Sequence, residues 1–351
     1  MGLFILRRFG IMILTALCLT FIVFWLTNLY PKLEVLAKTQ GNFRMSDEAV
    51  TTFLDNRGYT QALPIKYGQW LGVLPGYVIE GSDGETRARC ELRGPPSDIN
   101  PPLSRYCGII QGNWGFSTVA KVEVSDVLPT RLANTGKLMF WVMLVMIPGA
   151  LTIGVLAGMR EGSKMDRSLS TVSIVSTATP EYVSGVILIA LFATPLFGMQ
   201  FFKGSAASAV DDANFNNFFL PVITIALYGM GYIARMTRAS MTEVMTAQFV
   251  RTARLKGVNF RNIVMKHALR NALIAPFTVI MLQVPWLLNG VVIVETLFTY
   301  QGFGWELVRA ASNNDIEMLL GISVISVFVV LMTQLISDIG YVFLNPRIRI
   351  S

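Results

Sequence analysis

The sequence has one histidine and three cysteines, and their positions do not favour an active site or a metal site. His267 lies in a basic stretch with no cysteine or acidic cluster nearby, so we interpret it as a surface contact rather than a metal ligand. No Ser/His/Asp set and no carboxylate pair can be assembled. The phosphate-binding pattern G-x-x-x-x-G-K-S/T is also missing. We therefore expect a non-catalytic chain that binds no cofactor or metal and does not hydrolyse ATP.

Charged residues are scarce as well. They make up 15% of the chain, whereas hydrophobic residues make up 53%, and the mean hydropathy is +0.53. A helix needs about 20 apolar residues to cross a membrane, and six runs meet that need: 9–30, 136–158, 169–197, 217–235, 274–297 and 317–344. A soluble protein would have to bury all six in one core. The sequence thus predicts an all-α polytopic membrane protein with six transmembrane helices.

The basic residues predict the topology, because cytoplasmic loops carry an excess of Lys and Arg. They gather at Arg7 and Arg8, in 159–168, in 236–273, and at Arg347 and Arg349, so both termini are expected in the cytoplasm of a bacterial cell. The net charge of +7 comes from these loops and argues against nucleic-acid binding. We expect an inner-membrane protein embedded in lipid.

Three parts are predicted along the chain. Residues 1–31 form an uncleaved first transmembrane helix, since their apolar run is too long for a signal peptide. Residues 32–133 have as many acidic as basic residues and are expected to be a large periplasmic loop between the first two helices. Within it, 124–134 has the amphipathic pattern of an interfacial helix. Residues 134–351 hold the other five helices.

The periplasmic segment contains a stretch rich in Gly, Pro and charge, at 74–108, which cannot form long helices. Cys90 and Cys107 bracket much of it. In an oxidising periplasm this pair is suited to a disulfide worth about 3 kcal/mol, and two free thiols are the alternative. The third cysteine, Cys18, lies within the first apolar run and is out of reach. Two roles for the stretch are left as alternatives: a docking surface for a binding protein, or an enlarged loop without a binding role.

The apolar runs also contain helix breakers and carboxylates. Pro148-Gly149, Thr179-Pro180 and Gly229/Gly231 are expected to interrupt the second, third and fourth runs, as along a solute pathway. Small residues also permit close helix crossings. Carboxylates inside spans are costly and are candidates for function. Candidate pathway or gating residues are Pro148, Pro180, Glu181, Gly229, Gly231 and Glu295; we expect Asp338 to pair with a basic loop residue.

The most informative stretch is the basic loop 236–273. From Arg235 to Leu273 it has eight basic residues and one acidic residue, Glu243. Gly257 after Lys256 predicts a helix end, and a second helix is expected to begin near Asn259 or Asn262. Val250, Ala253 and Gly257 have the spacing of one helix face made of small residues. The loop thus predicts a short helix, a glycine turn and a second helix that together protrude from the membrane.

The order of residues in this loop resembles a known motif. Phe-Val-Arg-Thr-Ala-Arg-Leu-Lys-Gly257, followed by His-Ala-Leu-Arg-Asn-Ala-Leu-Ile, is similar to the "EAA" loop of ABC importer permeases, in the form of the dipeptide/oligopeptide (Dpp/Opp) family. The stretches beginning at Glu295 (Glu-Thr-Leu-Phe) and Asp338 (Asp-Ile-Gly-Tyr) also resemble that family. So do Tyr67-Gly-Gln-Trp and Gly112-Asn-Trp-Gly, as two halves of one motif. The resemblance covers 1–31, 62–73 and 109–350.

This resemblance implies a permease subunit of a binding-protein-dependent importer for peptides or similar solutes. Its expected partners are a second, homologous permease, two ABC ATPase subunits that bind ATP and Mg²⁺, and a periplasmic solute-binding protein. The 249–257 helix would dock into the ATPase through Phe249, Val250, Arg251, Ala253, Arg254, Lys256 and Gly257. Two other classes stay open: an ion-coupled secondary transporter and a non-transporting membrane assembly protein.

Overall fold

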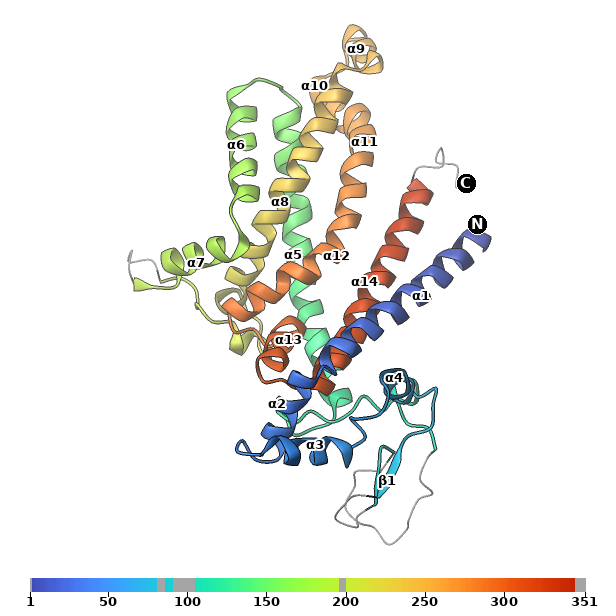
Figure 1. Cartoon of the computed structure of the whole chain (residues 1–351). Coiled ribbons are helices and arrows are strands. Elements are labelled where there is room, and N and C mark those ends of the chain that lie inside the picture. The colour runs from blue at the N-terminus through green and yellow to red at the C-terminus, as the bar shows by residue number, and fades with distance from the viewer. Residues whose placement is uncertain (1, 81–85, 91–104, 196–199, 345–351) are drawn as a thin grey trace. The chain divides into compact units, whose positions relative to one another are not determined.

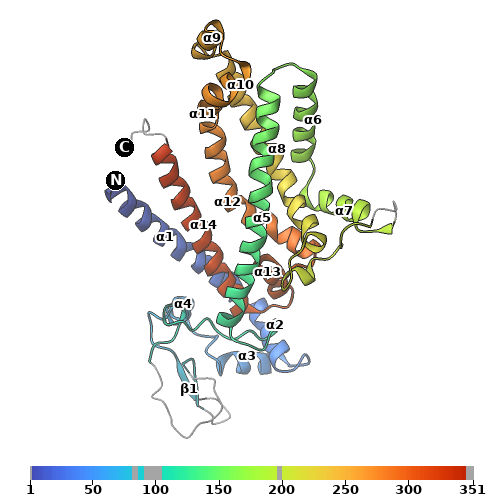
Figure 2. The same ribbon diagram turned by 180° about the vertical axis from the view of Figure 1, so that it is seen from behind.

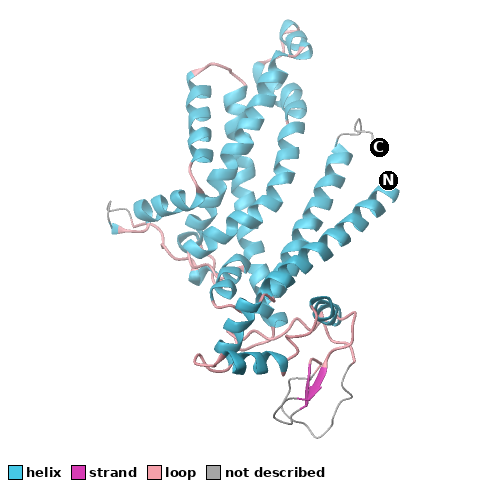
Figure 3. Ribbon diagram, viewed as in Figure 1, coloured by secondary structure: helices cyan, strands magenta, loops and turns pink. Residues whose placement is uncertain are grey.

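The computed structural model describes residues 2–80, 86–90, 105–195 and 200–344. The chain divides into two compact units. The first contains residues 1–130 and 307–328, and the second contains 131–306 and 329–351. Two long helices, α5 (Val124–Gly158) and α14 (Ile316–Leu344), contribute residues to both. The ribbon coloured by secondary structure is helical apart from loops and one short strand pair (Figure 3).

The first unit starts with the long helix α1 (Gly2–Thr27), followed by three short helices. These are α2 (Tyr30–Gln40), α3 (Asp47–Asp55) and α4 (Leu63–Leu71). Helix α3 begins where it does because Ser46 accepts a hydrogen bond from the Ala49 amide. Apolar side chains of these helices form one core with the start of α14; its buried members are Phe24, Leu33, Leu36, Ala37, Val50, Leu54, Trp70, Ile316 and Leu320.

The rest of the first unit is mostly loop. Strands β1 (Val78–Glu80) and β2 (Thr86–Ala88) pair antiparallel, with Val78 opposite Ala88. A short 3-10 turn, η1 (Ile109–Gln111), follows, and the loop before α5 is fixed by the buried Asp315. The Asp315 carboxylate accepts hydrogen bonds from the Ser117 hydroxyl, at 2.5 Å, and from the Val119 amide, at 3.3 Å.

The second unit is a helical bundle around α8 (Phe215–Thr246), with α6 (Lys164–Ala178), α7 (Glu181–Phe192) and α12 (Ile274–Leu297) against it. In Figures 1 and 2, α8 lies between α6 and α12. Its N-terminus is closed by a reciprocal capping box between Asn214 and Asn217. The buried core is built from the apolar faces of α5, α8 and α12, together with Phe298 and Tyr300.

Short elements complete this unit. They are η3 (Ala207–Ala209), α9 (Gln248–Leu255), α10 (Phe260–Asn262), the π-helical η4 (Ile263–Ala268), α11 (Leu269–Ala272) and α13 (Phe303–Ser312), of which the last is shared with the first unit.

Among the residues that the structure describes, four helices are long and apolar enough to cross a membrane: α1, α5, α8 and α14. The number rises to six if each of two bent helix pairs counts as one span. One pair is α6 with α7, bent by 107°, and the other is Phe260–Ala272 with Ile274–Gln283, bent by 52°. The all-α, multi-span fold predicted from the six apolar runs is confirmed.

Several helix boundaries differ from the predictions. The residues 124–134 do not form a separate interfacial helix, because α5 is continuous from Val124 to Gly158. It also passes through Pro148 without the predicted interruption. Helix α8 likewise runs through Gly229 and Gly231 and continues to Thr246, well into the predicted loop. Close packing against neighbouring helices keeps the backbone helical at Pro148, Gly229 and Gly231, although proline and glycine disfavour helices.

Candidate functional site

The loop expected to dock with a partner has the predicted helix, turn and helix. Helix α9 is separated from α8 by Ala247, whose ψ of 151° is extended. Gly257 has a φ of +74°, a left-handed conformation that favours glycine, and it ends the segment. The Asn259 side chain then accepts a hydrogen bond from the Arg261 amide at the start of α10. Both boundaries follow from local residue chemistry.

Of the three residues predicted to share one helix face, Val250 and Ala253 lie on α9, and Gly257 does not. Val250 and Ala253 are buried, because they pack onto Ile263 and Val258 of the same chain. Gly257 lies beyond the end of α9 and is exposed, with open space where a Cβ would be. Val250 and Ala253 therefore fasten α9 to η4, and a direct contact of these residues with an ATPase stays a prediction.

The surface that α9 does expose is apolar and basic. Leu255 is 83% exposed and Phe249 is 44% exposed, next to the exposed Arg251, Arg254 and Lys256. Sequence reasoning missed Leu255, although its neighbours were singled out. An isolated exposed leucine is ordinary, but α9 and its C-cap residue Lys256 together expose two large apolar side chains and three cations, a composition suited to contact with a partner.

This surface is firmly attached to α8. The Ser240 hydroxyl donates a hydrogen bond of 2.8 Å to the Ala272 carbonyl, which joins α8 to α11. Below it, the last turns of α8 share an apolar cluster with η4 and α11; its buried members are Met241, Met245, Val264, Ala268 and Ala272. The Arg160 guanidinium also lies over the Phe260 ring, 5.4 Å from its centroid. A displacement of α9 would therefore be carried into α8.

A second contact ties α8 to α6, and sequence reasoning did not anticipate it. The Arg238 guanidinium donates two hydrogen bonds to the Asp166 carboxylate, at 2.5 and 2.8 Å. The same carboxylate accepts from the Gly162 amide and the Ser170 hydroxyl, and Asp166 is only 2% exposed. This bidentate pair has geometric specificity that a single point contact lacks. The two residues are 72 positions apart, so no local pattern connects them.

The glycines predicted as breakers are instead packing sites. A Cβ on Gly229 would collide with the Met146 side chain of α5. A Cβ on Gly231 would come within 2.5 Å of the Ser173 carbonyl of α6. The Ser176 hydroxyl also donates to the Leu227 carbonyl of α8. The expectation that small residues allow close crossings is therefore confirmed, because α8 approaches both α5 and α6 tightly.

The interruption predicted at Thr179-Pro180 is present. Helix α6 ends at Ala178 and α7 starts at Glu181, with an angle of 107° between them. Pro180 has no amide hydrogen to continue the helix and is exposed. Glu181 is half-buried in the first turn of α7, where a carboxylate complements the helix dipole. We keep both as pathway candidates because the chain changes direction there.

Glu295 is fully buried, and its carboxylate is occupied by protein groups. It accepts hydrogen bonds from the Thr135 hydroxyl at 2.5 Å and from the Trp305 amide at 2.9 Å. The Thr135 oxygen in turn accepts from the Phe303 amide at 2.7 Å. A Cβ on Gly302 would collide with the Glu295 carboxylate. Glu295 thus fixes the turn between α12 and α13 against α5, and its pathway or gating role stays a prediction.

Arg131 strengthens the same turn. Its guanidinium donates to the Gln301 carbonyl and side chain, at 3.1 and 2.9 Å, and lies 3.1 Å from the Glu306 carboxylate. Asp338, the remaining carboxylate singled out, belongs to α14, and its pairing with a basic loop residue stays a prediction.

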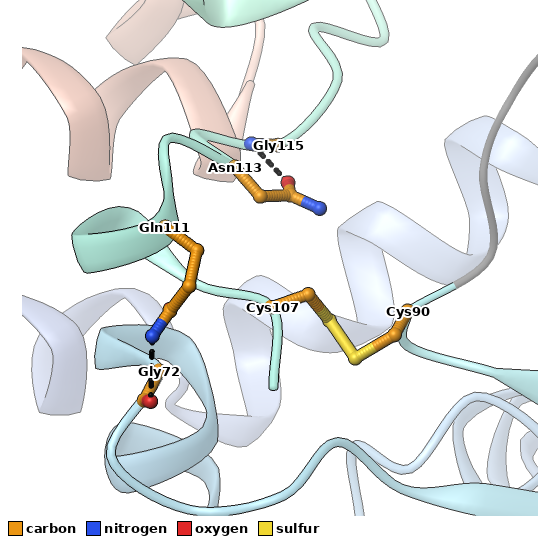
Figure 4. Close-up of a disulfide and its surroundings, with 6 residues drawn as sticks. All are labelled: Gly72, Cys90, Cys107, Gln111, Asn113 and Gly115. Carbon is orange, nitrogen blue, oxygen red and sulfur yellow. Dashed lines mark hydrogen bonds between the residues drawn. A yellow bond between two sulfur atoms is a disulfide. The ribbon is translucent and has the colours of Figure 1, made fainter. Parts of the chain in front are cut away.

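The two motif halves around the 74–108 stretch meet in the first unit (Figure 4). The Gln111 side chain donates a hydrogen bond of 3.1 Å to the Gly72 carbonyl. A Cβ on Gly108 would collide with the backbone of Gly72, so the chain closes tightly on itself. Cys90 and Cys107 are joined by a disulfide with a Cα–Cα distance of 5.4 Å. Much of the stretch itself, 81–85 and 91–104, lies outside the described residues.

Comparison with known proteins gives concordant matches. Residues 150–350 match the family model described as "Binding-protein-dependent transport system inner membrane component". The oligopeptide transport system permease protein AppB of Bacillus subtilis is 32% identical over 69% of this chain and 77% of its own length. The di/tripeptide transport system permease protein DppB of Pseudomonas aeruginosa is 32% identical over 79% of this chain and 91% of its own.

The dipeptide transport system permease protein DppB of Escherichia coli is 31% identical over 69% of this chain and 78% of its own length. The family match contains α6 to α14 and the whole loop that carries α9. It removes the two alternatives left open by the sequence, a secondary transporter and an assembly protein. The chain belongs to the binding-protein-dependent transport system inner membrane components and is a multi-pass inner-membrane permease subunit of an ABC importer.

Proposed function

We propose that this permease conducts peptides. The printed names of the relatives at about one-third identity describe dipeptide, di/tripeptide and oligopeptide systems. The solute would be delivered by a periplasmic binding protein and would pass between this chain and a second, homologous permease. Two ATPase subunits would hydrolyse ATP on the cytoplasmic side, and this chain would bind neither ATP nor Mg²⁺. An isotope-labelled dipeptide should fail to accumulate in cells lacking the chain.

The topology follows from charge. Both termini and α9 would lie in the cytoplasm, and 32–133 would lie in the periplasm. The exposed cations Arg251, Arg254 and Lys256 next to α9 agree with the excess of basic residues in cytoplasmic loops. The disulfide between Cys90 and Cys107 agrees with an oxidising compartment for the other side.

The observation that carries the coupling proposal is the surface of α9. Phe249 and Leu255 would enter an apolar cleft of the ATPase, and the three cations would surround them as a polar rim. Val250 and Ala253 would act indirectly, by holding α9 on η4. ATP-driven closure of the ATPases would then move α9, and the contacts of α8 with α11, α5 and α6 would transmit that motion to the spans in an alternating-access cycle.

The test uses Leu255→Asp, which places a charge at the most exposed apolar side chain of α9. Pull-down from membranes in mild detergent should recover the second permease and lose the ATPase. The matched control is Phe43→Asp, since Phe43 is 78% exposed but lies in the loop before α3, within the proposed periplasmic region. The control should retain the ATPase. Normal recovery of the ATPase with Leu255→Asp would contradict docking through this surface.

A further inference from the structure

Helix α8 is enclosed by its neighbours along most of its length. Gly229 faces α5, Gly231 faces α6, and Thr224 lies against Gly185 of α7. Between Asn217 and Ala239, the exposed side chains are Tyr232, Arg235, Met236 and Ala239, all in the C-terminal half. Tyr228 is half-buried and precedes Tyr232 by four residues, so the two lie on one face. Arg235 and Ala239 continue that face.

The chemistry of this stripe, defined as Tyr228, Tyr232, Arg235, Met236 and Ala239, differs from the outer surface of α6. At 45% exposure, Tyr232 presents a phenol, and Arg235 presents a guanidinium. At the depth of Arg235, α6 exposes Arg167 and Ser168. At the depth of Tyr232 it exposes Thr171 and, as large side chains, the apolar Val172 at 55%, Ile174 at 52% and Val175 at 58%. Lipid tails accept the second kind of surface, whereas charged and polar groups within a span turn toward protein or water.

The stripe ends abruptly at an aromatic pair. The Tyr228 ring stacks on the Trp286 ring of α12, with centroids 4.7 Å apart and an interplanar angle of 12°. Towards the N-terminus of α8, the same face continues with Pro221, Thr224 and Ile225, at seven, four and three residues before Tyr228. All three are buried. The side chains of this face are therefore exposed on the C-terminal side of the Tyr228–Trp286 pair and buried on its N-terminal side.

We propose that the stripe is a wall of the cytoplasm-facing half of the solute path, and that the stacked Tyr228 and Trp286 close this half from the rest. The assignment of this half to the cytoplasmic side, and of the solute as a peptide, rests on the proposed function. The recognition chemistry fits a peptide: the Tyr232 hydroxyl can bond to a backbone amide, Arg235 can pair with a terminal carboxylate, and the aromatic faces can contact apolar side chains.

Helix α6 supplies a control position at the same depth in the membrane as Tyr232 of α8. Helices α6 and α8 are antiparallel, since Arg238 meets Asp166 while Gly231 meets Ser173. By the same register Tyr232 lies level with Val172. A cysteine at either position would have similar exposure in this chain but a different surrounding, aqueous for Tyr232 and lipid for Val172.

The experiment compares Tyr232→Cys with Val172→Cys, each with Cys18→Ser to remove the free thiol. The substitutions are made in the chromosomal gene, so that membranes hold the assembled importer. A charged methanethiosulfonate reagent is added to inside-out vesicles. Because it reacts with thiolates, which form in water and not in lipid, Tyr232→Cys should be modified at least ~10-fold faster than Val172→Cys. Equal rates would overturn the proposal.

A second measurement tests closure by the aromatic pair. Thr224→Cys, one turn beyond Tyr228, should resist modification with Trp286 intact and become reactive when Trp286→Ala is added. If Trp286→Ala leaves the rate unchanged, the pair does not close the path. Neither measurement requires solute or ATP. Failure of the proposed topology would be distinguishable, because Tyr232→Cys would then react faster from the opposite face of the membrane.

Discussion

The two regions that project from the predicted spans are stabilised in different ways. The loop with α9 is short, and its small apolar side chains fasten it to η4 and α8. The region 31–123 has short helices around a core shared with α1 and α14, and a disulfide closes part of it. The first arrangement transmits displacement to a long helix, and the second resists displacement locally. Substitutions in the two regions should therefore affect different properties.

Gly257→Trp should have the largest effect. At a φ of +74° a side chain costs about 1–2 kcal/mol, and the indole would also project from the exposed end of α9. We expect peptide uptake to be abolished and the ATPase to be lost in pull-downs, while membrane insertion stays normal.

The matched control is Gly112→Trp, because Gly112 has a φ of +84° and open space around it but lies in the other region. It should retain the ATPase. Uptake at the normal level with Gly257→Trp would show that α9 does not dock as proposed.

Arg238→Gln should come next, since it leaves the buried Asp166 carboxylate without its bidentate partner. Removal of one member of a buried pair costs about 3–5 kcal/mol, and we expect the lower end because Arg238 is partly exposed. The midpoint of thermal unfolding of the purified complex should fall, and uptake should decrease. Arg167→Gln removes an exposed charge from the same helix as Asp166 and serves as the control. Equal midpoints for the two variants would contradict the structural importance of the pair.

Cys90→Ser should reduce the stability of the region 31–123 only. Loss of a disulfide that closes a loop of this length costs about 2–3 kcal/mol, and the loss should appear as faster proteolysis within 31–123. The ATPase should co-purify normally, because α9 is unaffected. Mass spectrometry of the wild-type chain should detect the bridged peptides, and free thiols at both positions would remove the basis of this prediction.

Tyr67→Phe should have the smallest effect. It removes the hydroxyl that contacts the Thr20 hydroxyl at 2.8 Å and the Leu17 carbonyl at 3.1 Å, a loss of about 1 kcal/mol. The ring still packs against Phe24 and Trp70. Proteolysis within 31–123 should accelerate less than in Cys90→Ser, with uptake unchanged. An effect equal to that of Cys90→Ser would mean that the hydrogen bond, and not the covalent bridge, dominates the stability of this region.

The features predictable from sequence are those set by local chemistry. The apolar runs predicted the spans, and Gly257 with Asn259 predicted the turn between α9 and α10. The contacts between distant residues were not predictable. Whether Ala253 is exposed depends on Ile263, and whether Gly229 breaks a helix depends on Met146. Glu295 was singled out as a pathway or gating candidate, but its partners Thr135 and Trp305, which come from other helices, were not predicted.

The close approach of Gly72 to Gly108 brings the two ends of the intervening stretch together. Both residues lie within the first unit, and beside them the Gln111 side chain donates a hydrogen bond to the Gly72 carbonyl. A direct join across 73–107 would remove the Val73 and Leu74 amides, which donate to the Gly68 carbonyl at the end of α4, so a shortened loop should keep these two residues. The same junction is a suitable insertion site for a foreign epitope or a fluorescent domain, by which this subunit could be followed in living cells.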